Sequence, residues 1–243
     1  MKPYVFGHRG ASGYEIENTI PSFRKGVEMG AGIETDIQMT IDHKLICFHD
    51  PIIKVGNEYF YPSKLTYDTI ARLKFDDKRK VPQIIEVFQE FMNENHNIRY
   101  SFDIANRKVG LELINLAEEN NLIDSIEISD RRIGVLSSLR RRSDSVKLLN
   151  TNDGSFTRIN YQTLDIDKLK DHQISTINVR YKRNIDTLFK DIVDNGFDCY
   201  VWGVNKIQNM KQVLKLNYKG KIVDAIYTDY PDKLIELREK LIK

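Results

Sequence analysis

Two histidine-containing dipeptides, His8-Arg9 and His49-Asp50, and two closely spaced carboxylates stand within the first fifty residues of the chain. His8 is followed directly by Arg9, and His49 comes later in the same stretch. Between them, Glu34 and Asp36 are separated by a single residue. An imidazole can transfer a proton near neutral pH, a carboxylate offers hard oxygen ligands to a divalent cation, and a guanidinium binds phosphate oxygens through a planar pair of N–H groups. This combination indicates metal-assisted attack on a phosphate ester, with His8 and His49 as proton carriers.

The spacing of Glu34 and Asp36 indicates a metal site. Residues i and i+2 of a strand share one face, so two unpaired carboxylates there repel each other and raise each other's pKa. A bound cation relieves this repulsion, and Asp103, at the end of a later predicted strand, adds a third oxygen ligand. Three carboxylates with water suit Mg²⁺ or Ca²⁺. The alternative is that one carboxylate pairs with Arg9 and the other is hydrated.

Short apolar runs of β type alternate with helical patterns along most of the chain. We expect eight strands, within residues 4–6, 33–37, 98–104, 125–128, 146–149, 174–179, 199–204 and 225–227. Helical patterns cover residues 19–29, 110–120, 133–139, 185–195, 206–216 and 231–241, and a hairpin joins residues 33–37 to 44–48. Eight βα units in 243 residues predict a TIM (β/α)8 barrel in one domain, residues 1–243. A doubly wound open sheet is the alternative, because periodicity does not show closure.

Active residues of such a barrel lie at the C-terminal ends of its strands. His8 and Arg9 follow the first predicted strand, and Asp103 ends the third. Trp202 and Asp229 lie at the ends of the last two. The polar side chains that could take part in catalysis are therefore expected to meet at one end of the barrel, its mouth.

The bulk composition is that of a soluble globular protein, with 41% hydrophobic and 30% charged residues. The formal net charge is +2, so charge does not indicate a nucleic-acid partner. The phosphate-ester chemistry of the first fifty residues indicates a small-molecule substrate instead. No apolar run approaches the roughly 18 residues of a membrane span, and we expect neither a transmembrane segment nor a signal peptide. Cys47 and Cys199 stand in apolar strand-like runs, which predicts buried free thiols and a cytoplasmic protein.

Short motifs in order along residues 4–231 resemble the glycerophosphodiester phosphodiesterase family. They are HRGASG at residues 8–13, ENT at 17–19, ETDI at 34–37, HD at 49–50, VP at 81–82, WGVN at 202–205 and TDYP at 228–231. Each motif alone is weak, whereas their shared order and spacing make the resemblance specific.

The resemblance implies a TIM barrel and a metal-dependent enzyme that hydrolyses glycerophosphodiesters to sn-glycerol 3-phosphate and an alcohol. It implies the following roles: His8 and His49 as the acid/base pair, Arg9 as the phosphate ligand, Glu34 and Asp36 as metal ligands, Glu17 and Asn18 as residues that shape the site around Arg9, and Trp202 as an apolar wall. The family carries an inserted cap between the His-Asp motif and a Pro-started helix. Residues 51–80 would form a short cap here.

The chain departs from the family at the third strand, where the family has Glu-x-Lys and this sequence has Asp103-Ile104-Ala105. Asp103 keeps an oxygen ligand with a shorter reach, whereas Ala105 removes a cation expected near the phosphate. Such a loss can raise the barrier by on the order of 3 kcal/mol. Two residues could replace the cation: Lys147, expected to face the barrel interior from the fifth strand, and Arg180, at the end of the sixth. A structural role is the alternative for each.

Two other functions stay open. A lysophospholipase D activity would use the same phosphate chemistry and would need an apolar channel for an acyl chain, to which Tyr59, Phe60 and Tyr61 are the hint. The other is a phosphate-ester binding or regulatory protein with weak catalysis, which would explain why Asp103 and Ala105 replace the Glu and Lys of the family. Tight binding of glycerol phosphate without turnover would favour the binding protein over both enzymes.

Overall fold

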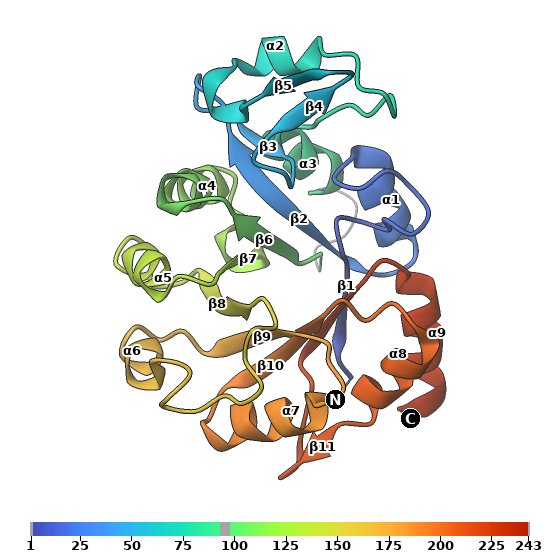
Figure 1. Ribbon diagram of the computed structural model, residues 1–243, viewed down its shortest axis with the longest axis vertical. Coiled ribbons are helices and arrows are strands. Elements are labelled where there is room, and N and C mark those ends of the chain that lie inside the picture. The colour runs from blue at the N-terminus through green and yellow to red at the C-terminus, as the bar shows by residue number, and fades with distance from the viewer. Residues whose placement is uncertain (1, 93–97, 243) are drawn as a thin grey trace.

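Eight parallel strands close into a barrel in the computed structural model, which describes residues 2–92 and 98–242 (Figure 1). They are β1 (Tyr4–Gly7), β2 (Gly32–Met39), β6 (Tyr100–Ile104), β7 (Ile126–Asp130), β8 (Lys147–Asn152), β9 (Thr176–Arg180), β10 (Asp198–Trp202) and β13 (Ala225–Thr228). The strands pair in that order, and β13 pairs again with β1 through Tyr4 and Ala225. The TIM barrel prediction is confirmed, and the open sheet is excluded.

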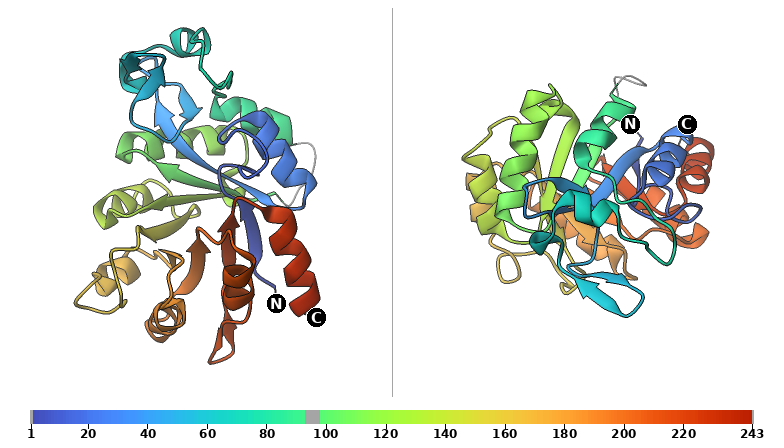
Figure 2. Two further views of the ribbon diagram at one scale, coloured as in Figure 1. Left: turned by 45° about the vertical axis from the view of Figure 1, so that its right-hand side comes forward. Right: turned by 90° about the horizontal axis from the view of Figure 1, so that it is seen from above.

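Helices follow the strands and surround the barrel (Figure 2). They are α1 (Ile20–Glu28), α3 (Ile84–Phe91), α4 (Arg107–Glu119), α5 (Ile133–Arg140), α6 (Ile166–Asp171), α7 (Ile185–Asp194), α8 (Ile207–Leu214) and α9 (Pro231–Leu241). Strand β9 shows how successive side chains alternate between the apolar core outside the barrel wall and the barrel interior. Ile177 and Val179 belong to the large apolar core, whereas Asn178 between them faces the barrel interior. This alternation decides which side chains reach the inside of the barrel.

The sequence pattern misses two features around β8. Strand β8 continues to Asn152, past the predicted end at residue 149, because its last residues are polar and do not read as a strand. Helix α6 is not predicted because six residues are too few to show a period. It is nevertheless capped by Asp165, which accepts a hydrogen bond from the N–H of Lys168, and it buries Ile166 and Leu169.

The segment between β2 and α3 adds a small unit at the top of Figure 1. Its elements are β3 (Leu45–Cys47), β4 (Ile53–Val55), β5 (Glu58–Phe60), the 3₁₀ turn η1 (Pro62–Lys64) and α2 (Tyr67–Ala71). The antiparallel pairing of β3 with β2 confirms the predicted hairpin. The unit has its own apolar core around Ile46, Phe48 and Ile70. Residues 66–74 carry a helical pattern, in agreement with α2, but the sequence does not indicate the β4–β5 hairpin, whose strands are only three residues long.

A short turn η2 (Ile123–Ser125) and a hairpin of β11 (Asn217–Tyr218) with β12 (Lys221–Ile222) complete the described elements. None of the helices in the described ranges has both the length and the apolar character needed to cross a bilayer. Cys47 and Cys199 are both buried and unpaired, as the sequence predicts.

The interior at the N-terminal ends of the strands holds a network of charged and aromatic side chains. Lys147 is the first residue of β8, and its Nζ donates a hydrogen bond to the Tyr200 hydroxyl at 2.6 Å. Arg99 forms an ion pair with the buried Glu127 and lies over the ring of Tyr4 at 4.4 Å. This placement corrects the prediction that Lys147 binds substrate. The side chain does point inward, but β8 begins at Lys147, so the residue lies at the opposite end of the barrel from the strand ends where the other predicted residues meet.

Candidate active site

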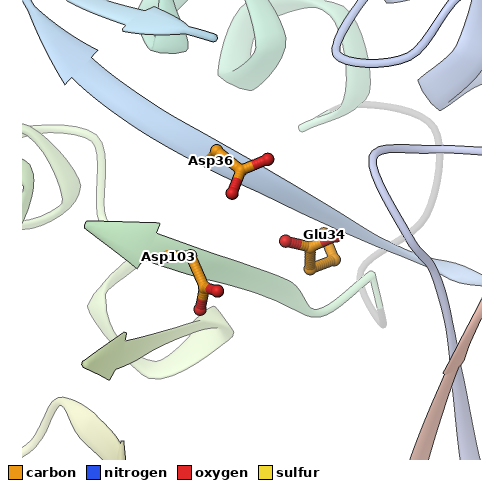
Figure 3. A group of neighbouring side chains, drawn as sticks. All are labelled: Glu34, Asp36 and Asp103. Carbon is orange, nitrogen blue, oxygen red and sulfur yellow. The ribbon is translucent and has the colours of Figure 1, made fainter. Parts of the chain in front are cut away.

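Three carboxylates meet at the C-terminal end of the barrel. Glu34 and Asp36 come from β2, and Asp103 comes from β6 as the register partner of Asp36. One oxygen of each lies within 4.8 Å of the others, and Figure 3 shows the three side chains turned toward a common space. The cluster forms because β2 and β6 are neighbours in the barrel.

Burial and mutual repulsion shift the pKa values of two of these carboxyl groups. Burial raises the pKa of Glu34 to about 8, and the charges of Asp36 and Asp103 add to the shift against an opposing effect of His8. Burial, followed by the charge of Asp36, raises the pKa of Asp103 to about 6. A set of carboxylates that retains protons so strongly fits a divalent cation, which would replace those protons and offset the repulsion.

The turn after β1 requires an unusual backbone. Arg9 has φ of 56° and Gly10 has φ of 82°, both in the left-handed region. A Cβ on Gly10 would lie 2.5 Å from the carbonyl carbon of Ser22 in α1, so a glycine is needed there. The turn directs the backbone N–H of Arg9 toward Glu34 Oε2 at 2.7 Å.

The side chain of Arg9 lies between two acids. Its Nη1 donates a hydrogen bond to Glu17 at 2.9 Å, and its Nε lies 3.1 Å from Asp36 Oδ2. The Nε contact does not have hydrogen-bond geometry, and this buried N–H has no hydrogen-bond partner among the residues that the structure describes. Arg9 is therefore held by two acids, while its Nε–H is ion-paired with Asp36 without a hydrogen bond.

Asn18 supports the carboxylates from outside the cavity. Its backbone also lies in the left-handed region, with φ of 55°, and its side chain is buried. Its Nδ2 donates to Asp36 Oδ2 at 3.2 Å, while its Oδ1 accepts a hydrogen bond from Thr35 at 2.7 Å. Asn18 thus orients Asp36.

An acid and an amide from two adjacent strand ends hold His8. Its Nδ1 lies 2.8 Å from Asp229 Oδ1, and Asn205 donates a hydrogen bond to the other oxygen of Asp229. Burial opposes protonation of His8, but the bond to Asp229 and the charge of Glu34 outweigh it and raise the pKa of His8 to about 9. The sequence gives neither residue a role; the signal that could have identified them is their position, since Asp229 directly follows β13 and Asn205 lies in the loop that follows β10.

His49 approaches from the loop after β3. Its Nδ1 lies 2.7 Å from Asp50 Oδ1, and 45% of its side chain is exposed. Gln38 of β2 donates a hydrogen bond to its carbonyl at 3.3 Å. His49 also borders a second space of about 220 Å³, which includes Glu17 and Phe75 beside the inserted unit. The two histidines therefore reach the site from different loops.

The predicted residues surround one cavity of about 110 Å³ at the mouth of the barrel. Its lining residues are His8, Arg9, Glu34, Asp36, His49, Asp103, Thr151, Asn178, Trp202 and Tyr227. Glu17 and Asn18 contact Arg9 and Asp36 from outside this lining. Lys147 is not brought to it.

The sequence prediction includes Arg180 but misses the rest of the wall that β8 and β9 contribute. Trp202 donates from Nε1 to the carbonyl of Asn152 at 3.2 Å, which fixes the ring against this wall. Thr151 accepts a hydrogen bond from Asn178 Nδ2 at 3.3 Å. Arg180, the last residue of β9, lies over the Trp202 ring at 5.2 Å. A polar residue between two apolar ones in a buried strand is the signal that could have identified Asn178.

Known proteins resemble this chain over almost its whole length. Residues 8–233 match the glycerophosphoryl diester phosphodiesterase family. A glycerophosphodiester phosphodiesterase of Caldanaerobacter subterraneus subsp. tengcongensis is 28% identical over 99% of both chains. Lysophospholipase D GDPD1 of Homo sapiens is 24% identical over 93% of this chain and 83% of its own. The structure of an Oleispira antarctica phosphodiesterase in complex with the product sn-glycerol-3-phosphate has a TM-score of 0.77 at 16% identity, with 97% of this chain and 96% of that chain covered.

Proposed function

Because the chain belongs to the glycerophosphoryl diester phosphodiesterase family, we propose that it hydrolyses a glycerophosphodiester to sn-glycerol 3-phosphate and an alcohol. The observation that carries this proposal is the meeting of His8 and His49 with three clustered carboxylates in one cavity. Cleavage of a phosphodiester needs a proton acceptor, a proton donor and neutralisation of charge on the phosphate, and these groups can supply all three.

Glu34, Asp36 and Asp103 would hold the divalent cation, which we propose to be Mg²⁺ or Ca²⁺. The all-oxygen ligand set and the raised pKa values of Glu34 and Asp103 support a hard cation. Such an ion supplies positive charge to the phosphate oxygens.

Arg9 would bind a phosphate oxygen. Glu17 and Asp36 hold its guanidinium in place, and its buried Nε–H, which makes no hydrogen bond to Asp36, would gain an acceptor from a bound phosphate. A buried donor without a partner costs free energy, which an anion in the cavity would recover.

His8 and His49 would share the proton transfers. One takes the proton of the nucleophile, which is water or the 2-hydroxyl of the substrate's glycerol, and the other protonates the oxygen of the departing alcohol. Asp229 holds the His8 ring in place and favours its charged form. Asp50 orients His49 in the same way, through Nδ1.

The inserted unit would cap the His49 side of the mouth, but it does not favour a lysophospholipid. Tyr59 and Tyr61 are 63% and 47% exposed, and their rings face the ammonium groups of Lys54 and Lys64. Phe60 packs instead on the unit's own core. These three aromatic residues therefore do not form a channel for an acyl chain.

We also propose a cytoplasmic location. Cys47 and Cys199 are free thiols in the core, which suits a reducing compartment.

The test is release of glycerol 3-phosphate from glycerophosphocholine with Mg²⁺, with Ca²⁺ and with a chelator. Wild type should turn over in a metal-dependent way. His8→Ala and His49→Ala should each lose about 10²-fold or more in kcat, whereas His172→Ala, a matched change on the loop after α6, should not. Turnover that persists in chelator, or that is absent with either metal, would contradict the proposal. Lysophosphatidylcholine as a second substrate tests the alternative activity.

A further inference from the structure

We propose that β9 forms a second substrate-binding wall, in which Asn178 accepts a hydrogen bond from a hydroxyl of the substrate's glycerol moiety and Arg180 binds an oxygen of its phosphate. The inference rests on the proposed function. In the closed barrel β9 lies four strands from β2 in either direction, so this wall stands across the mouth from Glu34 and Asp36.

Asn178 and Arg180 belong to the same row of side chains. Residues two apart in a strand share a face, and Ile177 and Val179 take the other face, in the apolar core. Asn178 lines the 110 Å³ cavity. Arg180, at the last position of β9, continues this row toward the mouth.

Asn178 presents an unused acceptor to the cavity. The residue is 5% exposed, and its Nδ2 donates to Thr151, but its Oδ1 has no partner within the described part of the chain. A buried carbonyl oxygen that lacks a donor costs free energy. A phosphate oxygen is an acceptor and cannot satisfy it, whereas a glycerol hydroxyl is a donor and can.

Arg180 is a cation that the protein positions without neutralising it. Its guanidinium lies 5.2 Å from the ring centroid of Trp202, its register partner on β10. Gly154, with φ of 90°, lies against the stem of Arg180, where a Cβ on this glycine would be 3.3 Å from Arg180 Cδ. Within residues 2–92 and 98–242 no carboxylate pairs with Arg180, whereas Arg132, in the loop after β7, is paired with Asp130.

The arginines already at the site are paired with acids, so a further cation could bind the phosphate. The guanidinium of Arg9 already contacts Glu17 and Asp36. Ala105 borders the adjoining space with Asp103 and adds no charge, and the two arginines of that space, Arg131 and Arg132, are each paired with an aspartate. A second guanidinium across the mouth would bind the phosphate oxygens on the side that Arg9 does not reach.

The experiment measures kcat/KM for glycerophosphocholine, and the binding of sn-glycerol 3-phosphate and of inorganic phosphate by calorimetry. Arg180→Ala should weaken the binding of both ligands by about tenfold or more, and it should lower kcat/KM by about the same factor. Arg180→Lys should recover part of the loss because it keeps the charge. Arg183→Ala, an exposed arginine in the following loop, is the control. A lysine at the apolar third-strand position, as Ala105→Lys in the Arg180→Ala background, should restore turnover.

Asn178→Ala separates the two parts of the wall. It should weaken the binding of sn-glycerol 3-phosphate by about tenfold and leave the binding of inorganic phosphate unchanged, because inorganic phosphate has no glycerol hydroxyl to donate to Asn178. Its urea unfolding midpoint checks that the barrel stays intact. The inference is overturned if Arg180→Ala behaves like Arg183→Ala, or if Asn178→Ala weakens both ligands equally. If the binding of glycerol 3-phosphate depends on Arg180 and Asn178 in this way but wild type does not turn over glycerophosphocholine, the inference about β9 is supported and the proposed function is contradicted.

Discussion

The two ends of the barrel interior bury the same kind of side chain in opposite electrostatic states. Glu127, near the N-terminal ends of the strands, is 3% exposed and paired with Arg99. Glu34, toward the mouth, is 5% exposed, and its hydrogen bond comes from the backbone N–H of Arg9. Glu34 also faces two further carboxylates. Burial of an acid is therefore not what marks the site; what marks it is the gathering of three acids, of which Asp36 pairs with Arg9 and Glu34 faces His8.

The largest effect should come from Glu34→Gln. The change removes a metal ligand, so kcat/KM should fall by on the order of 10²–10³-fold. The metal-free protein should be as stable as wild type or more so, because a neutral amide replaces a buried and repelled carboxyl. Turnover with Mg²⁺ and urea unfolding without it measure the two effects. Glu236→Gln, on the exposed face of α9, is the control, and undiminished metal-dependent turnover in Glu34→Gln would remove it from the metal site.

A pH dependence of metal binding should follow from the same carboxylate. The folded pKa of Glu34, about 8, lies above its ordinary value of 4.5, so the folded protein binds this proton more tightly than the unfolded chain does. The contribution of Glu34 to stability is then present below pH 4.5 and is lost as the pH rises through about 8. Mg²⁺ competes with the proton, so its affinity should be about tenfold or more tighter at pH 8 than at pH 6. Calorimetry at both pH values measures this change, and an affinity independent of pH would show that Glu34 is already ionised.

Glu127→Gln should have the opposite outcome to Glu34→Gln. It leaves Arg99 without its ion pair at the N-terminal end of the barrel. Because 31% of the Arg99 side chain is exposed and water can hydrate it, the free energy of unfolding should fall by about 2 kcal/mol, less than for a fully buried pair. Turnover of the folded enzyme should not change. Urea unfolding and kcat measured on the same preparation decide the point, and a loss of turnover without a loss of stability would contradict the contrast between the two ends.

The smallest effect should come from Lys147→Met. Its ammonium bonds the Tyr200 hydroxyl, far from the carboxylate cluster, so the free energy of unfolding should fall by no more than about 1 kcal/mol. Turnover should match wild type, in contrast to Arg180→Ala. A tenfold fall in kcat for Lys147→Met would return this lysine to the substrate site.

Much of the architecture can be read from local patterns. The alternation of apolar β-type runs with helical periods predicts the βα units, because each period reflects which face of one element is buried. The spacing of Glu34 and Asp36 likewise predicts a shared face, since both lie on one strand. Local patterns miss α6, which is too short for a period, and the β4–β5 hairpin, whose strands have three residues each. They also miss the polar end of β8, where Thr151 lines the cavity.

Relations between distant strands depend on the closed barrel. Whether Asp229 and Asn205 reach His8 depends on the closure of β13 onto β1, which no local pattern encodes. The register also decides at which end of the barrel a side chain lies. Lys147 and Asn178 both face inward, yet one starts its strand and contacts Tyr200, while the other stands further along its strand and lines the cavity. Local periodicity sets the face of a residue, because it depends on the backbone of one element, whereas its height and its partners across the barrel follow from the pairing of all eight strands.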